Sequence, residues 1–101
     1  MAKLELQAWN YQVLMLSQAL QGAISPNFRK VSLGHDGRRW LLRFVLQQNY
    51  SEDLEEIEDI VSQFEAFQNE QISLSVEVEI TADSSLPDVS PDRVVFRRRE
   101  P

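Results

Sequence analysis

Residues 72 to 81 alternate apolar and polar side chains without a break, from Ile72 to Thr81. Successive side chains of a strand point to opposite faces of its sheet, so this period of two predicts a strand with one buried face and one face in water. Such a strand needs neighbouring strands and a layer of apolar side chains over one face only. The chain is therefore expected to form a sheet that other elements cover on one side.

Two segments show the three- and four-residue spacing of amphipathic helices. The first helix is predicted over residues 3 to 21, and Gly22 is expected to end it because glycine tolerates the left-handed conformation. The second is predicted from Ser51, whose hydroxyl can accept hydrogen bonds from the free amides of a first turn, to about residue 69. The apolar stripes consist of Leu6, Trp9, Val13, Leu16 and Leu20 in the first helix and of Leu54, Ile57, Ile60, Val61, Phe64 and Phe67 in the second.

A hairpin is predicted between the two helices. Phe28–Leu33 and Arg39–Gln47 have the composition of strands, and residues 34 to 37 between them contain the Asp-Gly pair that favours tight turns. The second of these strands is apolar on nearly both faces, so we expect it at the centre of the sheet. Residues 82 to 91 form a predicted polar loop, and Arg93–Arg98 a short last strand.

These elements predict a single α+β domain over residues 1 to 101, in the order αββαββ. We expect a two-layer sandwich in which both helices pack on one face of a four-stranded sheet. The second helix returns the chain across the sheet, so the strands before and after it should run parallel with a right-handed crossover. The four strands are predicted to lie side by side in their sequence order.

Composition excludes several classes of site. The chain has no Cys, which excludes a thiolate nucleophile, a zinc knuckle and an iron–sulfur cluster. Its 3 Gly are dispersed, so no phosphate-cradling loop is expected. The first residues do not resemble a secretory signal, and no apolar run approaches the roughly 20 residues that cross a bilayer. We therefore expect a cytoplasmic protein that makes no membrane contact.

Charge is distributed very unevenly along the chain. Residues 1 to 43 carry six basic and two acidic side chains, residues 44 to 92 carry thirteen acidic side chains and no Lys or Arg, and residues 93 to 101 carry four Arg and one Glu. One interpretation is that these charges only solvate the surface and form exposed cross-strand pairs such as Arg43 with Glu77. The other is that the second helix presents an acidic surface to a basic protein partner.

The second interpretation gives the candidate partner-binding site, which consists of Glu52, Asp53, Glu55, Glu56, Glu58 and Asp59. An alternative function is nucleic-acid-associated regulation through an arginine-rich surface, although the acidic pI of about 4.7 makes a nucleic-acid partner the less favoured hypothesis. That basic patch would consist of Arg29, Lys30, Arg97, Arg98 and Arg99. A third alternative is a homodimeric structural module whose interface includes Tyr11 or Phe28.

Catalytic chemistry has little support in the sequence. His35 could act as a general base with the carboxylate of Asp36 orienting it. Polar residues in a turn more commonly solvate the turn and form hydrogen bonds with its backbone. The serines lack a nucleophile-elbow context, and the helix carboxylates lack the spacing of an EF-hand. We therefore predict a protein that is not an enzyme, with no catalytic, cofactor-binding or metal site.

The segment from Leu20 to Ser32, followed by the hairpin and by Tyr50–Leu54, resembles a group of small uncharacterised bacterial proteins. These are similar to single αββαββ domains, and some of them resemble immunity proteins encoded beside secreted toxins. The resemblance implies a non-enzymatic protein that neutralises a toxin by occupying its active site. It implies no functional residue, because the group has no established site to match.

Overall fold

The computed structural model describes residues 5–83, 86 and 92–100. The order αββαββ is confirmed, and the boundaries differ from the predicted ones by only a few residues. The elements are α1 (Leu6–Leu20), β1 (Phe28–His35), β2 (Trp40–Leu46), α2 (Ser51–Ala66), β3 (Leu74–Ile80) and β4 (Arg93–Arg97). The predicted first residues of α1 and most of the predicted polar loop lie outside the described residues.

The four strands form one sheet in the order β3-β2-β1-β4. The parallel pairing of β2 with β3 is confirmed, with Arg43 opposite Glu77, and β1 pairs antiparallel with β2. The prediction that the strands follow their sequence order is wrong, because β4 pairs antiparallel with β1 at the edge opposite β3. β1 therefore lies inside the sheet, between β2 and β4, and is buried along almost its whole length.

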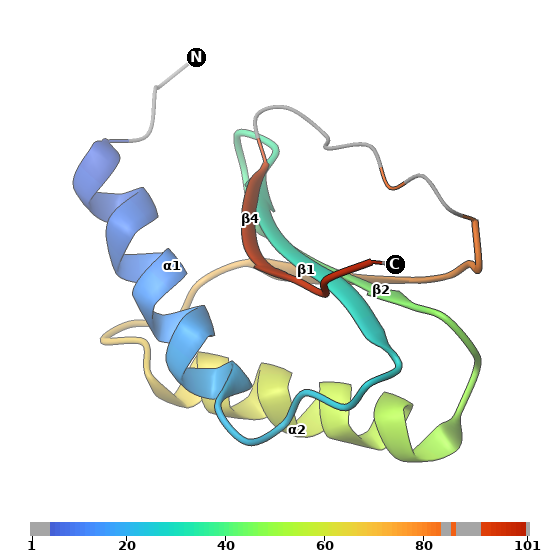
Figure 1. The fold of residues 1–101 in the computed structure, drawn as a ribbon. Helices are drawn as coiled ribbons and strands as arrows, with labels where there is room; N and C mark the ends of the chain where they lie inside the picture. Colours follow the sequence, from blue (N-terminus) through green and yellow to red (C-terminus); the bar gives the residue numbers. More distant parts are fainter. Residues whose placement is uncertain (1–4, 84–85, 87–91, 101) are drawn as a thin grey trace.

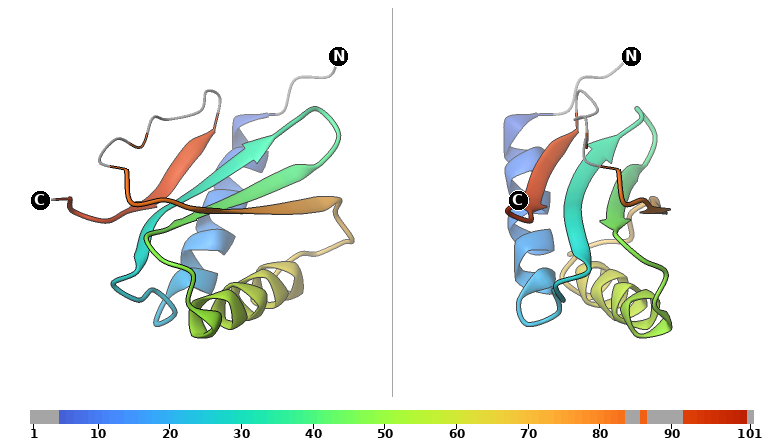
Figure 2. Two further views of the ribbon diagram at one scale, coloured as in Figure 1. Left: turned by 90° about the vertical axis from the view of Figure 1, so that its right-hand side faces the viewer. Right: turned by 45° about the vertical axis from the view of Figure 1, so that its right-hand side comes forward.

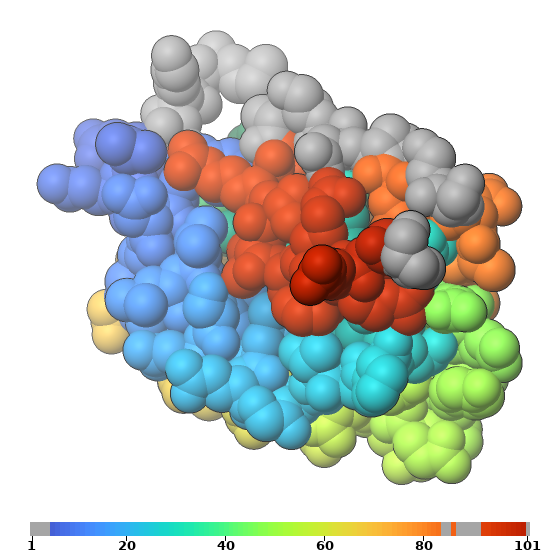
Figure 3. All heavy atoms as spheres, in the orientation of Figure 1, coloured from blue at the N-terminus to red at the C-terminus, as the bar shows by residue number. Residues whose placement is uncertain are grey.

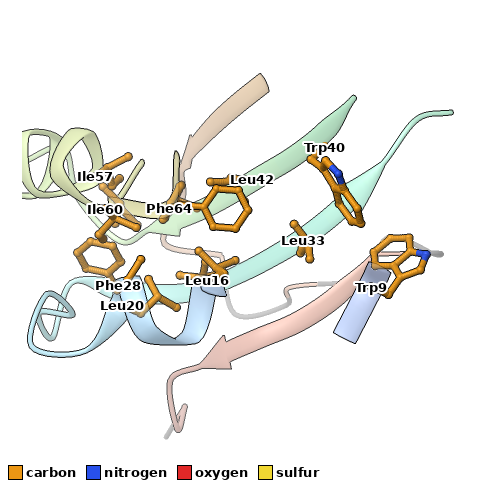
Figure 4. Packing of buried hydrophobic residues seen from close by; sticks show 14 residues of the cluster. Trp9, Leu16, Leu20, Phe28, Leu33, Trp40, Leu42, Ile57, Ile60 and Phe64 are labelled. Carbon is orange, nitrogen blue, oxygen red and sulfur yellow. The ribbon is translucent and has the colours of Figure 1, made fainter. Parts of the chain in front are cut away.

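Both helices pack on the same face of the sheet, as predicted (Figure 1; Figure 2). Side chains of α1 and α2 meet those of β1 and β2 in one apolar core (Figure 4). The inner face of β2 supplies alternate residues to this core, as a period of two requires, whereas in β1 a register shift after Phe28 interrupts the alternation. Its fully buried members include Leu16, Phe28, Val31, Leu33, Leu42, Phe44, Leu46 and Phe64.

Two tryptophans hold the first turns of α1 against the sheet. The rings of Trp9 and Trp40 meet edge to face, with centroids 5.1 Å apart and an interplanar angle of 81°. The guanidinium of Arg93 lies 4.8 Å from the centre of the Trp9 ring, which is a cation–π distance. α1, β2 and β4 therefore meet at this end of the molecule.

The hairpin turn forms as predicted. The Oδ1 atom of Asp36 accepts hydrogen bonds from the backbone amides of Arg38 and Arg39, both at 2.9 Å, and Gly37 has a φ of +94°. The bonds from Arg39 and Arg38 hold the pKa of the Asp36 carboxyl below its ordinary value. His35 Nδ1 accepts the amide of Gly37, so both candidate catalytic side chains of this turn bond the turn itself.

β3 differs from the prediction in one respect. Its alternation is real, but the apolar face is not buried, because the side chains of Val76, Val78 and Ile80 are 38 to 41% exposed. β3 is an edge strand and contributes no residue to the buried core, which α1, β1, β2 and α2 build among themselves. The sequence pattern distinguished the two faces of this strand correctly. The predicted place of the strand inside the sheet was wrong, because β3 lies at an edge.

Gly34 leaves room for a carboxylate from the other end of the chain. A Cβ atom at this position would overlap the Oδ1 atom of Asp92, which precedes β4. We predict that Gly34→Ala lowers the free energy of unfolding by about 1–3 kcal/mol, the usual cost of overpacking, as measured by urea denaturation. The same substitution should cost less in an Asp92→Ala background, where the overlap is absent. Equal costs in both backgrounds would show that the overlap is not the cause.

Candidate protein-binding surface

The candidate acidic surface lies on the solvent side of α2. Glu52, Glu55, Glu58 and Asp59 are exposed, and Glu56 is half-buried. The stripe of Ile57, Ile60 and Phe64 faces the core and turns these carboxylates outward. We call the set Glu52, Glu55, Glu56, Glu58 and Asp59 the acidic face of α2.

No described cation compensates the charge of the acidic face. α2 contains no Lys or Arg, and among the described residues no ion pair reaches any carboxylate of the face. Glu52 and Glu56, like Glu55 and Asp59, are four residues apart, and each such like-charge pair destabilises a helix by about 0.2–0.5 kcal/mol. Only Glu52 lies in the first turn, where the helix dipole favours a negative charge. The face therefore reduces the stability of its own helix.

Contrary to the prediction, Asp53 is not part of this face, because it is buried. Its side chain is 7% exposed. Its Oδ1 atom accepts the hydroxyl of Ser25 at 2.8 Å, and its Oδ2 atom accepts the side-chain amide of Asn27 at 2.9 Å. Asp53 therefore ties the first turn of α2 to the loop between α1 and β1.

The predicted basic patch does not form as a single exposed surface. Arg29 and Lys30 are 2% and 5% exposed, so the prediction that they belong to an exposed patch is wrong. Arg97 and Arg99 are exposed, whereas Arg98 is half-buried. The sequence shows which side chains are basic, but it does not show that β1 is covered on both faces.

Arg29 is a structural residue. Its Nη1 atom donates to the backbone oxygen of Thr81 at 2.7 Å, and its Nη2 atom donates to Glu100 at 3.2 Å. Arg98 also donates to both carboxylate oxygens of Glu100 and to the backbone oxygen of Pro26. These hydrogen bonds from Arg98 and Arg29 hold the pKa of the Glu100 carboxyl below its ordinary value.

The aromatic residues suggested for a dimer interface are also used within the fold. Phe28 is fully buried in the core, so it cannot belong to an exposed patch. Tyr11 is half-buried, and its hydroxyl donates to the backbone oxygen of Phe67 at 2.8 Å. Next to it, the side-chain amides of Gln12 and Gln68 exchange two hydrogen bonds of 2.7 and 2.9 Å. These contacts join α1 to the end of α2, and no local pattern in the sequence indicated them.

The other face of the sheet is bridged by Arg43. Its guanidinium pairs with Glu77 on β3, as the sequence predicted, and its Nε atom lies 2.6 Å from the Oδ2 atom of Asp92. The Asp92 pair is a close ionic contact that lacks the alignment of a hydrogen bond. Glu79, two residues beyond Glu77, is exposed and forms no ion pair with another described residue. The exposed carboxylate of Glu79 therefore adds negative charge to this face of the sheet.

Other kinds of site find no support in the described part of the chain. No cluster of three acidic or histidine side chains is placed to hold a metal ion there. No helix among these residues is long and apolar enough to cross a membrane. The exposed features of the described residues include the acidic face of α2 and the apolar and acidic side chains of β3.

A family model described as MafI2 immunity protein matches residues 10–100. The chain belongs to this family. The match spans α1 from Asn10 onward and every later element, so both the acidic face of α2 and the edge of β3 lie within the MafI2 region. No curated protein matches the chain. Membership of the MafI2 family indicates an immunity or inhibitor role and a protein as partner.

Substitutions of Asp53 and of Glu52 compare a structural carboxylate with an exposed one. We predict that Asp53→Ala lowers the free energy of unfolding by about 2–3 kcal/mol, because it leaves two donors without their charged acceptor. The melting temperature should fall by about 10–20 °C in differential scanning calorimetry. The control Glu52→Ala changes an exposed neighbour and should stay within about 0.5 kcal/mol of the wild type. Similar losses in both variants would contradict the structural role of Asp53.

Glu100 should make stability depend on pH. Because its folded pKa is lowered, its contribution is present above the ordinary value of 4.5 and is lost as pH falls through the folded pKa. We predict that Glu100→Gln is less stable than the wild type at pH 7 and that this difference shrinks below pH 4.5. Urea denaturation at several pH values measures it, with exposed Glu70→Gln as the control. A difference that stays constant down to pH 3, roughly below the ordinary range of Glu, would contradict the assignment.

Proposed function

We propose that this protein is an immunity protein that neutralises a toxin by binding it, with the acidic face of α2 covering a basic surface of the toxin. The observation that carries the proposal is the lack of any cation on α2 or any ion pair to its acidic face among the described residues. Membership of the MafI2 family supports the immunity role. The choice of surface rests on charge and exposure.

The chemistry of the partner follows from the charge. A toxin that acts on nucleic acid needs Lys and Arg side chains to neutralise phosphates. An acidic protein surface can occupy the same side chains, and the opposite charges raise the rate at which the two proteins meet. We therefore propose a basic toxin, with a nuclease as the class that fits best. Inhibition by coverage needs no catalytic group on the immunity protein.

The cost of the acidic face to its own helix also supports this proposal. Like charges four residues apart weaken α2, and a substitution by Lys or Gln would relieve the repulsion at once. Proteins commonly accept lower stability at sites where a function depends on the unfavourable arrangement. A basic partner removes the repulsion in the complex, because its cations lie between the carboxylates. In this proposal the protein acts in the cytoplasm of the cell that it protects.

The proposal predicts the effect of charge reversal. A variant with Glu55→Lys, Glu58→Lys and Asp59→Lys should bind the toxin that the wild-type protein neutralises at least about tenfold more weakly, mostly through slower association, and should lose protection in cells that express that toxin. The matched control reverses three exposed carboxylates elsewhere, Glu5→Lys, Glu70→Lys and Asp83→Lys, and so makes the same change in net charge.

Surface plasmon resonance at low and high salt measures both variants. The wild-type association rate should fall steeply with added salt, whereas the α2 variant should show a weaker dependence than the control. Toxin binding that is reduced equally in both variants would show a general effect of net charge and would contradict the assignment to α2. Unchanged binding in the α2 variant would contradict it as well.

A further inference from the structure

β3 is an edge strand whose outer side pairs with no other strand in the described part of the chain. It runs parallel to β2 over seven residues without a register shift, and no described strand lies beyond it. The backbone oxygen of Ser73 accepts the amide of Trp40, and the amide of Thr81 donates to Leu46, both across the β2 pairing. Since backbone groups alternate sides along a strand, the N–H and C=O groups of the even-numbered residues 74 to 80 point away from β2.

The two edges of the sheet differ in how well they are protected. β4 is five residues long, has a register shift in its pairing, carries Arg at both ends and contacts α1 (Figure 3). Short strands, bulges, basic side chains and covering elements all oppose the addition of another strand. β3 contains no Pro, Lys or Arg and shows no bulge in its pairing with β2. It is therefore the edge that can accept a further strand.

The side chains of β3 define what such a strand would contact. Val76, Val78 and Ile80 form an exposed apolar stripe on the face that carries the helices. Glu77, which pairs with Arg43, and Glu79, which has no ion pair with a described residue, project from the other face. An added strand with apolar side chains on the first face and basic side chains on the second would match both. Alternating apolar and basic residues are thus the sequence that fits this edge.

A second copy of the chain fits this edge poorly. If two β3 strands pair with matching faces, the carboxylates of one copy lie beside those of the other, where like charges destabilise the pair. If the faces are opposed, the Glu side chains of one copy lie against the apolar stripe of the other. The charge of β3 therefore favours a basic partner over self-association.

We propose that the outer edge of β3 binds an extended segment of a basic protein as a fifth strand of the sheet. This inference rests on the proposed function, because it takes the basic toxin as the partner. β3 and the first turns of α2 lie on the side of the molecule away from α1 and β4 (Figure 2). A toxin held by the acidic face of α2 therefore lies on the same side as the β3 edge. Backbone hydrogen bonds to β3 give affinity, and the alternating side chains give specificity.

The test uses a synthetic eight-residue peptide in which lysine and valine alternate, with both ends blocked. A second peptide of equal charge and composition carries N-methyl groups on alternate backbone amides, so it cannot complete the hydrogen bonds of a strand. Isothermal titration calorimetry compares the two on the wild-type protein. We expect the methylated peptide to bind at least about tenfold more weakly. Equal binding of the two peptides, or no binding of the first, would overturn the proposal.

Variants of the protein test the proposal independently of the peptide comparison. Val78→Pro removes one outward N–H group, and proline is compatible with an edge strand when its missing N–H faces solvent. The matched control Val78→Thr keeps both the N–H group and the branched shape. We expect the proline variant to bind the peptide about tenfold more weakly than the wild type. The threonine variant should bind it less than about fivefold more weakly. Circular dichroism checks folding, and the peptide comparison stands by itself if the proline variant fails to fold.

Hydrogen exchange locates the bound peptide. The amides of Val76, Val78 and Ile80 should become protected when the peptide is added, whereas protection at β4 or at no strand would overturn the proposal. A wild-type dimer that Val78→Pro converts to a monomer would also overturn it, because the edge would then belong to a second copy. Toxin binding separates the two hypotheses. If the α2 variant loses toxin binding but Val78→Pro does not, the β3 proposal alone is overturned. If both variants keep toxin binding, the proposed function is overturned.

Discussion

The ionic contacts of Arg43 connect the two edges of the sheet to its centre. Its guanidinium, on β2, contacts Glu77 on one edge strand and Asp92 just before the other. No residue of either edge strand is fully buried in the core, although Leu74, Val95 and Phe96 pack against it, so backbone pairing and these ionic contacts add to that packing. Asp92 is only 6% exposed, which makes its partner important, because an unpaired buried carboxylate is costly. The absence of a side chain at Gly34 gives this carboxylate its space.

Much of the fold was predictable because it depends on local patterns. The alternation of β3, the helical spacing of α1 and α2 and the Asp-Gly turn each report a backbone geometry within a few residues. The parallel pairing followed from the crossover through α2, and it brought Arg43 opposite Glu77 as expected. The lateral place of each strand was not predictable in this way. A period of two distinguishes the faces of a strand but does not say which strand lies beside it.

In the candidate site, too, local features were predictable and long-range contacts were not. The helical spacing of α2 correctly placed most of its carboxylates in solvent, whereas Asp53 was missed because its partners, Ser25 and Asn27, lie in a distant loop. Arg29 was misjudged for a related reason. Its burial depends on Thr81 and Glu100, which are 52 and 71 residues away in the sequence. Charged side chains with structural and with surface roles look alike until their long-range partners are known.

The parallel pairing of β2 with β3 also has a consequence for folding. The β1–β2 hairpin closes through a short turn, but Arg43 and Glu77 are 34 residues apart, and α2 lies between them. Contacts between distant residues require more loop-closure entropy and form later on average than local ones. β3 is therefore expected to join the sheet after the hairpin and α2 have formed. The surface on the β3 side of the molecule exists only once folding is complete, so a nascent chain presents α2 before it presents a finished sheet edge.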